Sequence, residues 1–240
     1  MISVKGLTLK NQKNTLISNL SIDFNQGEFW AIIGKNGTGK TTLLNTLAGF
    51  IAYQQGVITI DNQEISTLDA LSKSQKIAFL PQMPEASLDC TVKQSIAYGR
   101  YPWHKDFSTR QKDAKIIQLA LQQMQLESIQ DKSIQQISGG ELRKVEIATV
   151  LAQNSKALMF DEPLNHLDIS MRYRLMDQLN KLIKNKTIII VTHDIQYVQQ
   201  YCSHVLILQD NTETKFGSVS QIMTNENLNK HLEIPYKKFQ

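Results

Sequence analysis

Cysteine is scarce in this chain of 240 residues, as are tryptophan, proline and long apolar runs. The two cysteines, Cys90 and Cys202, are far apart and form no Cys-x-x-Cys pair, which excludes a disulfide framework and a cysteine-rich zinc site. The longest aliphatic run, residues 188–191, has the length of a strand, whereas a membrane-spanning helix needs about 20 mostly apolar residues. No basic start followed by apolar residues marks a signal peptide. We therefore expect a soluble, cytoplasmic protein that relies on another protein to span any membrane at which it works.

A large excess of charge of one sign is lacking as well. The 26 basic and 22 acidic residues leave a formal net charge of +4, with no clustered basic stripe, so nucleic acid is not the expected partner. The 41% hydrophobic and 20% charged content is ordinary and excludes disordered, collagen-like and low-complexity classes. The length suits one well-filled domain, so we expect residues 1–240 to form a single domain.

Short apolar segments alternate with turns and helical patterns along most of the chain. Apolar runs without polar interruption are typical of a parallel sheet that is covered on both faces. From residue 91 to 151 the pattern is helical instead. We therefore predict one α/β core with a helical insertion at roughly residues 84–150. The expected strands are residues 2–9, 16–24, 29–33, 57–60, 77–80, 157–160, 187–191 and 205–208, and the expected core helices are residues 41–50, 171–183 and 195–201.

A glycine-rich segment at residues 34–41 fits the phosphate-loop pattern G-x-x-x-x-G-K-[ST] between an apolar strand and a helix. Its glycines let backbone N–H groups surround phosphate oxygens, and the helix N-terminus adds a positive dipole end. Lys40 would reach the β- and γ-phosphates, and the Thr41 hydroxyl would bind Mg²⁺. An accidental match would occur in roughly one such chain in a hundred. The predicted nucleotide-binding residues are Gly34, Lys35, Asn36, Gly37, Thr38, Gly39, Lys40, Thr41 and Thr42.

Two carboxylates, Asp161 and Glu162, follow the apolar run of residues 157–160. An acid at the carboxyl end of a strand beside a phosphate loop is where Mg²⁺ needs a partner, so we assign Asp161 to the metal, through water. Glu162 would then orient and deprotonate the attacking water. Considered without the phosphate loop, a solvated acidic turn before Pro163 would explain this segment equally well.

Residues 138–141, Ser-Gly-Gly-Glu, precede a long helical pattern. The simple interpretation is a good N-cap with an acid in the first turn of the helix. A helix N-terminus with two glycines is also an anion site, and in a nucleotide-binding protein the anion would be phosphate.

Together these segments resemble, over essentially the whole chain, the nucleotide-binding subunit of an ATP-binding cassette (ABC) transporter. The phosphate loop is followed in the family's order by Gln82, the signature at residues 137–141, the acidic strand end, Leu167-Asp168 and His193. The resemblance implies a P-loop ATPase core with an N-terminal antiparallel β subdomain and an inserted helical subdomain. It also implies that Ser138, Gly139, Gly140 and Glu141 contact the ATP of a second copy, so that two chains enclose two nucleotides.

Three further roles follow from the resemblance. Gln82 would touch Mg²⁺ and the attacking water; without the other motifs it would be taken for an exposed glutamine. Asp168 would contact the partner chain, and it is also a suitable N-cap for a helix that starts near residue 170. His193 would bind the γ-phosphate and hold Glu162 and water in line, although a histidine at a strand end is more often packed or solvated.

The chain departs from the family pattern at two positions. The signature ends in Glu141, where glutamine is usual. The aromatic that usually stacks on adenine would stand at about Asn11, and no aromatic occurs among residues 1–23. Nucleotide binding should then depend on the phosphates, and discrimination between bases should be poor.

Within the family, residues 91–102, Leu167-Asp168-Ile169 and His193-Asp194 are similar to ATPases of importers for iron–siderophores, heme, cobalamin and some oxyanions. The resemblance implies integral membrane permease subunits and an extracytoplasmic substrate-binding protein as partners, with this chain peripheral on the inner face of the cell membrane. The alternative is a soluble ABC ATPase of iron–sulfur cluster assembly, for which Cys90 and Cys202 would be the only handles. We expect both cysteines to be buried apolar side chains instead.

Overall fold

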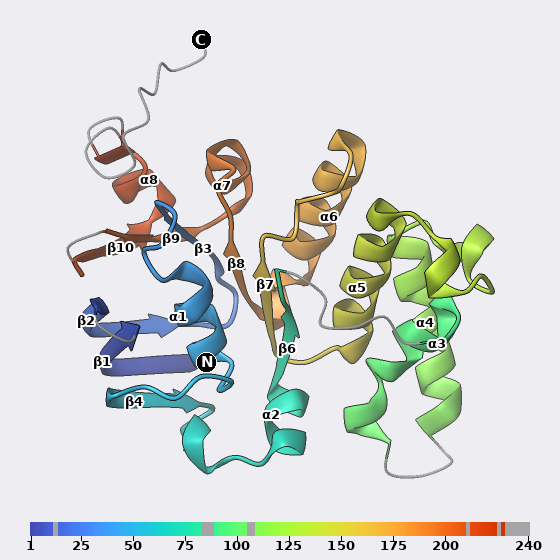
Figure 1. Cartoon of the computed structure of the whole chain (residues 1–240), viewed down its shortest axis with the longest axis horizontal. Helices are drawn as coiled ribbons and strands as arrows, with labels where there is room; N and C mark the ends of the chain where they lie inside the picture. Colours follow the sequence, from blue (N-terminus) through green and yellow to red (C-terminus); the bar gives the residue numbers. More distant parts are fainter. Residues whose placement is uncertain (12–13, 83–88, 105–108, 210–211, 225–226, 229–240) are drawn as a thin grey trace.

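The computed structural model describes residues 1–11, 14–82, 89–104, 109–209, 212–224 and 227–228 (Figure 1). A six-stranded sheet has the order β10-β9-β3-β8-β7-β6, and all its neighbours run parallel except β10, which is antiparallel to β9 at one edge. Its strands are β3 (Phe29–Gly34), β6 (Ile77–Leu80), β7 (Ala157–Asp161), β8 (Thr187–Val191), β9 (His204–Leu208) and β10 (Thr214–Ser218).

A second, antiparallel sheet has the strand order β2-β1-β4-β5. Its strands are β1 (Ile2–Asn11), β2 (Asn14–Phe24), β4 (Gln55–Ile60) and β5 (Gln63–Glu64). Side chains of β1 alternate between buried and more exposed positions, as a sheet with one covered face requires. The predicted α/β class with an N-terminal antiparallel sheet is confirmed.

The helices cover the parallel sheet on both faces. They are α1 (Lys40–Leu47), α2 (Ala70–Lys76), α3 (Val92–Tyr98), α4 (Thr109–Gln123), α5 (Gly139–Gln153), α6 (Ile169–Leu182), α7 (Ile195–Tyr201) and α8 (Val219–Ile222). Single 3₁₀ turns occur at Ile65–Thr67, Tyr101–Trp103, Glu127–Ile129, Ile134–Gln136 and Ile183–Asn185. In the part of the chain that the structure describes, none of the helices combines the length and the apolarity that crossing a bilayer requires.

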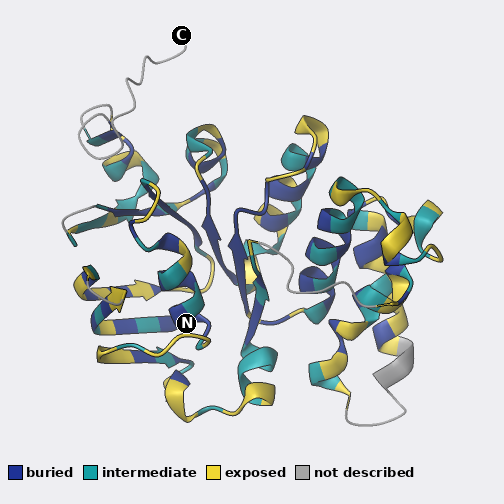
Figure 2. Ribbon diagram, viewed as in Figure 1, coloured by how far each residue is buried: buried dark blue, intermediate teal, exposed yellow. Residues whose placement is uncertain are grey.

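Alternate residues of β3 enter two different hydrophobic cores. Phe29, Ala31 and Ile33 pack with α5, α6 and α7, whereas Trp30 and Ile32 pack with α1 and the antiparallel sheet. Figure 2 shows the same arrangement, with buried residues concentrated on the central strands and on the helix faces turned toward them. Because both faces of the sheet are covered, its strands are apolar without interruption.

Helices α3, α4 and α5 pack on one another beside the sheet and form the helical insertion (Figure 1). Gly99 follows α3 and permits close packing, since a Cβ at this position would collide with the carbonyl oxygen of Thr149 in α5. The buried Arg100 donates from Nε to Asp113 Oδ1 of α4 at 2.8 Å and from Nη1 to Ala152 O of α5 at 2.8 Å. The insertion expected at residues 84–150 thus corresponds to α3–α5, with α5 continuing to Gln153; residues 83–88 lie outside the described part.

Several elements were not predicted from the sequence, namely α2, β5, β10 and α8. None of the residues of α2 is buried, so the helix has no apolar stripe to reveal it. The edge strand β10 is only partly buried and contains Gly217. The predicted helices 41–50 and 171–183 instead span Lys40–Leu47 and Ile169–Leu182.

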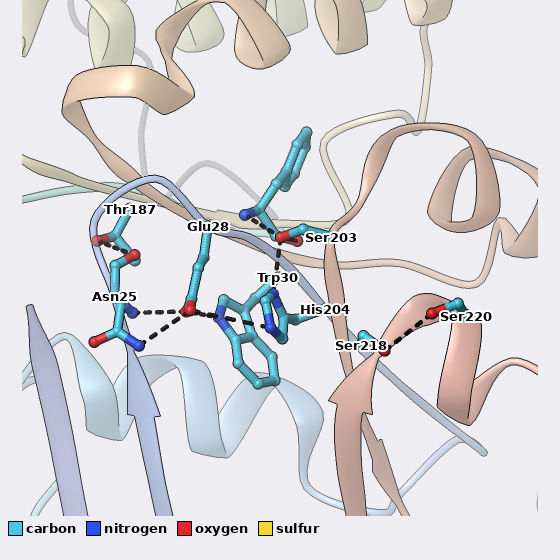
Figure 3. Close-up of polar contacts among 9 residues, drawn as sticks. Asn25, Glu28, Trp30, Thr187, Ser203, His204, Ser218 and Ser220 are labelled. Atoms are coloured by element: carbon cyan, nitrogen blue, oxygen red, sulfur yellow. Dashed lines mark hydrogen bonds and ion pairs between the residues drawn. The ribbon is translucent and has the colours of Figure 1, made fainter.

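Polar side chains at the amino ends of β3 and β9 are paired with one another (Figure 3). The Glu28 carboxylate accepts hydrogen bonds from Asn25 N at 2.8 Å, Asn25 Nδ2 at 3.0 Å and Trp30 Nε1 at 2.7 Å. Although partial burial acts to raise it, these bonds lower the pKa of Glu28. His204 stacks on Trp30 at a centroid distance of 4.6 Å, and its Nδ1 lies 2.9 Å from Ser203 Oγ. The polar side chains at this end of the sheet therefore find hydrogen-bond and stacking partners within the chain.

Candidate nucleotide-binding and hydrolysis site

Four loops meet at the carboxyl ends of β3, β6, β7 and β8, which are neighbours in the parallel sheet. They carry the phosphate loop, Gln82, Glu162 and His193 respectively, because parallel strands end at the same edge of a sheet. These loops enclose an open cleft of about 280 Å³. The cleft is lined by Asn11, Leu16, Asn36, Gly37, Gly39, Lys40, Thr41, Thr42, Gln82, Glu162, Val191 and His193. The structure thus brings most of the predicted phosphate-loop residues together with the three predicted catalytic side chains, whereas Gly34, Lys35 and Thr38 do not line this cleft.

The phosphate loop depends on glycine at two positions with left-handed backbone. Gly37 has φ +85° and Gly39 has φ +95°, values that side-chain-bearing residues rarely adopt. Gly39 is the N-cap of α1, and no side chain caps this helix end. The N-terminal N–H groups of α1 are therefore available to an anion, and the helix dipole favours negative charge there.

Lys40 is buried at the centre of the loop. Its Nζ donates to the carbonyl oxygens of Gly34 at 2.9 Å and Lys35 at 2.7 Å. Burial lowers the pKa of Lys40, and the carboxylates of Glu162 and Asp161 act in the opposite direction. A cation held among backbone carbonyls and facing two acids is well placed to bind phosphate oxygens.

Asp161 ends β7 and is fully buried. Neither carboxylate oxygen has a hydrogen-bond partner among the described residues, although the Thr41 hydroxyl lies close enough to lower the pKa of the carboxyl group. Burial raises this pKa, and Thr41, Lys40 and Arg143 counteract the rise. Two unpaired buried oxygens beside a hydroxyl are hard ligands of the kind that Mg²⁺ requires, so the residues present fit the predicted metal site.

Glu162 follows with φ +48°, an unusual conformation for a residue with a side chain. Its backbone N donates to Val191 O at 3.0 Å, and its Oε1 lies 3.1 Å from His193 Nε2. Burial and the neighbouring Asp161 raise the pKa of Glu162 to about 7, with Lys40 opposing and Asp194 adding to the rise. Burial and the charge of Lys40 lower the pKa of His193, which favours the neutral imidazole, while Asp194 acts in the opposite direction. A carboxyl group with this pKa is suited to accept a proton near neutrality.

The signature residues form the N-terminus of α5. Ser138 Oγ accepts from Glu141 N at 3.3 Å, and Glu141 Oε2 accepts from Ser138 N at 2.8 Å, which is a capping box. These bonds lower the pKa of Glu141, and they give the unusual glutamate in the signature a local structural role. The described residues that line the cleft do not include Ser138, Gly139, Gly140 or Glu141.

Asp168 is the N-cap of α6, and its Oδ1 accepts from Met171 N at 2.8 Å. The capping interpretation drawn from the sequence is therefore confirmed, with the helix beginning at Ile169. Asp168 does not line the described cleft either.

Sequence reasoning missed two residues at the site. Leu16 packs over the phosphate loop, where a Cβ on Gly39 would lie 3.1 Å from the Leu16 Cβ. Arg143 of α5 is buried and reaches the backbone of Asp161 and Glu162. The only sequence signal for Arg143 is a charged residue within an otherwise buried helix face. Asn11, the expected adenine position, does line the cleft, and residues 12–13 next to it lie outside the described part.

Comparison with known proteins identifies the family to which this geometry belongs. A sequence model of the family described as ABC transporter matches residues 17–165. The petrobactin import ATP-binding protein YclP of Bacillus subtilis (strain 168) is 32% identical over 225 residues, covering 93% of this chain and 89% of YclP. The ferric enterobactin transport ATP-binding protein FepC of Escherichia coli (strain K12) is 34% identical over 223 residues, covering 92% of this chain and 82% of FepC.

Solved structures agree with the sequence comparison. An inward-facing metal-chelate type ABC transporter matches with a TM-score of 0.82 at 27% identity, over 98% of this chain and 89% of that chain. The dimeric ATP-binding cassette MJ0796 bound to ADP and Pi matches with a TM-score of 0.81 at 26% identity, over 91% of this chain and 99% of that chain. The resemblance drawn from the motifs is confirmed: this chain belongs to the ABC transporter family and is one of its ATP-hydrolysing cassette subunits.

Proposed function

We propose that this chain is the ATP-hydrolysing subunit of an ABC importer, with a metal chelate such as an iron–siderophore or heme, cobalamin, or an oxyanion as cargo. The observation that carries the proposal is the cleft that Lys40 and Glu162 line at the carboxyl ends of the parallel strands, with the buried Asp161 close enough to affect the pKa of both. The relatives named for petrobactin import and ferric enterobactin transport support iron chelates among these cargoes. We further propose that residues 1–240 form one ATP-binding domain with α3–α5 as its helical subdomain.

In this proposal the phosphates of ATP bind the N-terminus of α1 and the Lys40 ammonium. Thr41, Gln82 and Asp161 would hold Mg²⁺, Asp161 through water. Bound Mg²⁺ would neutralise charge that develops on the phosphate oxygens. A Glu162 carboxylate oxygen takes the proton of the attacking water. His193 Nε2, 3.1 Å from Glu162 Oε1, holds that carboxylate in place and contacts the γ-phosphate.

The functional unit is a dimer of this chain in which each signature completes the partner's site. Ser138, Gly139 and Gly140 begin α5 outside their own cleft, which supports a role at a second nucleotide. Asp168 would meet the partner chain as well. In the absence of nucleotide each half-site is incomplete, so the isolated chain should be mostly monomeric.

Substitution of Glu162 tests the catalytic assignment. Glu162→Gln should retain binding, remove the base and trap an ATP-bound dimer, which light scattering with Mg-ATP measures as a doubled mass. Turnover by this variant at a rate near that of the wild type would refute the role given to Glu162.

The helical insertion is the proposed docking surface for the membrane permease. Gln82 precedes the insertion and Ser138 lies within it, at the start of α5. Both residues meet nucleotide in this proposal, so nucleotide binding and hydrolysis would move the insertion at two points. It also carries exposed aromatic side chains, Tyr98 at 53% exposure and Tyr101 at 72%. The assembled importer would include an extracytoplasmic substrate-binding protein, with this chain on the inner face of the cell membrane.

Copurification from native membranes tests the importer assignment. The tagged chain should bring down integral membrane subunits, and cross-links should fall near residues 83–100, of which 83–88 lie outside the described part. Tyr98→Glu should abolish copurification. Phe216→Glu, a matched change at an aromatic that is 42% exposed on β10, should not.

Recovery of soluble cluster-assembly proteins alone would favour the alternative in iron–sulfur cluster assembly. That alternative gains no support from the cysteines, because Cys90 and Cys202 are both buried and burial raises the pKa of each thiol.

A further inference from the structure

Arg143 occupies an unusual position for a charged residue. It stands in the first turns of α5, just after the signature, and only 4% of its surface is exposed. A buried guanidinium is costly unless its N–H groups are hydrogen-bonded and its charge is paired. Its partners therefore indicate what the residue holds in place.

The guanidinium of Arg143 joins the ends of two adjacent strands. Nη2 donates to Asp161 O and to Glu162 O, each at 3.0 Å, and both carbonyls lie at the end of β7. Nη1 donates to Pro81 O at 3.0 Å, directly after β6, and to Glu146 Oε2 at 3.0 Å within α5. One side chain of the helical insertion is thus bonded to the backbone beside both Gln82 and Glu162.

These bonds act on a residue with an unusual backbone conformation. Glu162 has φ +48°, and its N–H is held from the other side by Val191 O at 3.0 Å. Asp161 O belongs to the same trans peptide group as this N–H, so the charge-assisted bond from Arg143 fixes that group from the opposite side. The bond from Arg143 to Glu162 O fixes the next peptide group. The direction of the Glu162 side chain follows from these two peptide groups, so a shift of α5 against the sheet would turn the carboxylate.

We propose that Arg143 is a positioning residue for ATP hydrolysis. It aligns Glu162 with the segment leading to Gln82, and because Arg143 belongs to the helical insertion, this alignment depends on the position of the insertion relative to the sheet. The inference rests on the proposed role of Glu162 as the general base. Arg143 itself touches no reacting atom.

Another arginine provides a matched control for the loss of any bond between the core and the helical insertion. Arg174 of α6 donates from Nε to Gln123 O at 2.7 Å and from Nη2 to Gln122 O at 3.1 Å, at the end of α4. It makes the same kind of bond between the core and the insertion as Arg143 does. Its partners, however, lie outside the cleft.

The test compares Arg143→Met, Arg143→Gln and Arg174→Met in full-length protein. We expect Arg143→Met to lower kcat by roughly 10- to 100-fold, the size of effect that a small misplacement of a catalytic group produces. ATP affinity without Mg²⁺, measured by displacement of a fluorescent ATP analogue, should stay within about twofold because the bonds of Arg143 do not involve the phosphate loop. Arg143→Gln should recover part of kcat, since its amide still donates to carbonyls, and Arg174→Met should keep kcat within about twofold of the wild type.

Further measurements separate folding and dimer effects from positioning. Arg143→Met leaves Glu146 unpaired, so the double variant Arg143→Met/Glu146→Gln, which buries no lone charge, should show the same loss of kcat if it unfolds at the wild-type urea midpoint. In the Glu162→Gln background, Arg143→Met should still form the ATP-bound dimer. Loss of ATP affinity, loss of that dimer, or an unchanged kcat in Arg143→Met would overturn the inference. Hydrolysis by Glu162→Gln alone would instead refute the proposed role of Glu162 as the general base, on which this inference rests.

Discussion

The ligand-free chain should become more stable when Glu162 is replaced by glutamine, and the gain should depend on pH. Burial and Asp161 raise the pKa of Glu162 from 4.5 to about 7. The folded chain therefore binds a proton in this window that the unfolded chain has already released, so the free energy of unfolding falls as pH rises from about 4.5 to about 7. Glutamine has no proton to release, and the variant should lack this loss.

The size of the effect follows from the same two pKa values. One pKa unit corresponds to about 1.36 kcal/mol, so the rise from 4.5 to about 7 costs the wild type roughly 3 kcal/mol of stability at pH 8.5. At pH 5 most of this cost is absent, and the two proteins should differ by less than about 1 kcal/mol. Other groups that face Glu162, namely Lys40, His193 and Asp194, are present in both proteins.

Urea unfolding followed by tryptophan fluorescence, in EDTA and without nucleotide, measures the difference at several pH values between 5 and 8.5. Glu127→Gln, at an exposed glutamate in a 3₁₀ turn of the insertion, serves as the matched control and should show no pH-dependent gain. A gain from Glu162→Gln that is equal at pH 5 and pH 8.5 would show that the charge of Glu162 does not destabilise the fold, and the reasoning would be wrong.

Three other predictions can be tested directly. Lys40→Ala should weaken ATP binding in a titration, because the phosphate charge then lacks its buried cation, and unchanged affinity would contradict the role given to the loop. Stacking a base on an aromatic ring is worth roughly 1–3 kcal/mol, and residues 1–23 contain no aromatic side chain. GTP should therefore bind within about tenfold of ATP, and Asn11→Tyr should tighten ATP binding, both measured by titration. Strong ATP preference in the wild type would mean that another group holds adenine. Gly99→Ala should lower stability by about 1–3 kcal/mol in urea unfolding, because the new Cβ meets Thr149 O and must push α3 away from α5; wild-type stability would show that the two helices can separate freely.

Local sequence signals were sufficient for the parallel strands and the phosphate loop. The predicted strands 77–80 and 187–191 coincide with β6 and β8, because strands buried on both faces must be apolar throughout. The phosphate loop could be predicted from its glycines, because Gly37 and Gly39 adopt a left-handed backbone conformation that other residues avoid. The N-cap of α6 by Asp168 was also predictable, since a cap bonds to a neighbour three residues away.

Elements that make few apolar contacts could not be found in this way. Helix α2 buries none of its residues, and β10 owes its strand conformation to pairing with β9 rather than to a pattern of its own. The amphipathic period that identifies a helix exists only where one face is covered.

The sequence by itself therefore determined the family, the order of the motifs along the chain and the candidate phosphate-binding residues, because each of these depends on short segments with strict stereochemical demands. Only the tertiary structure decided the pKa values of the side chains in the site and the contacts that hold these side chains in place. The raised pKa of Glu162 needs burial and the charges of Asp161, at the end of β7, and of Asp194, which follows β8. The role of Arg143 needs carbonyls that lie 18, 19 and 62 residues away along the chain. Such effects arise from distances between segments, and those distances exist only after the sheet and the helical insertion have packed together.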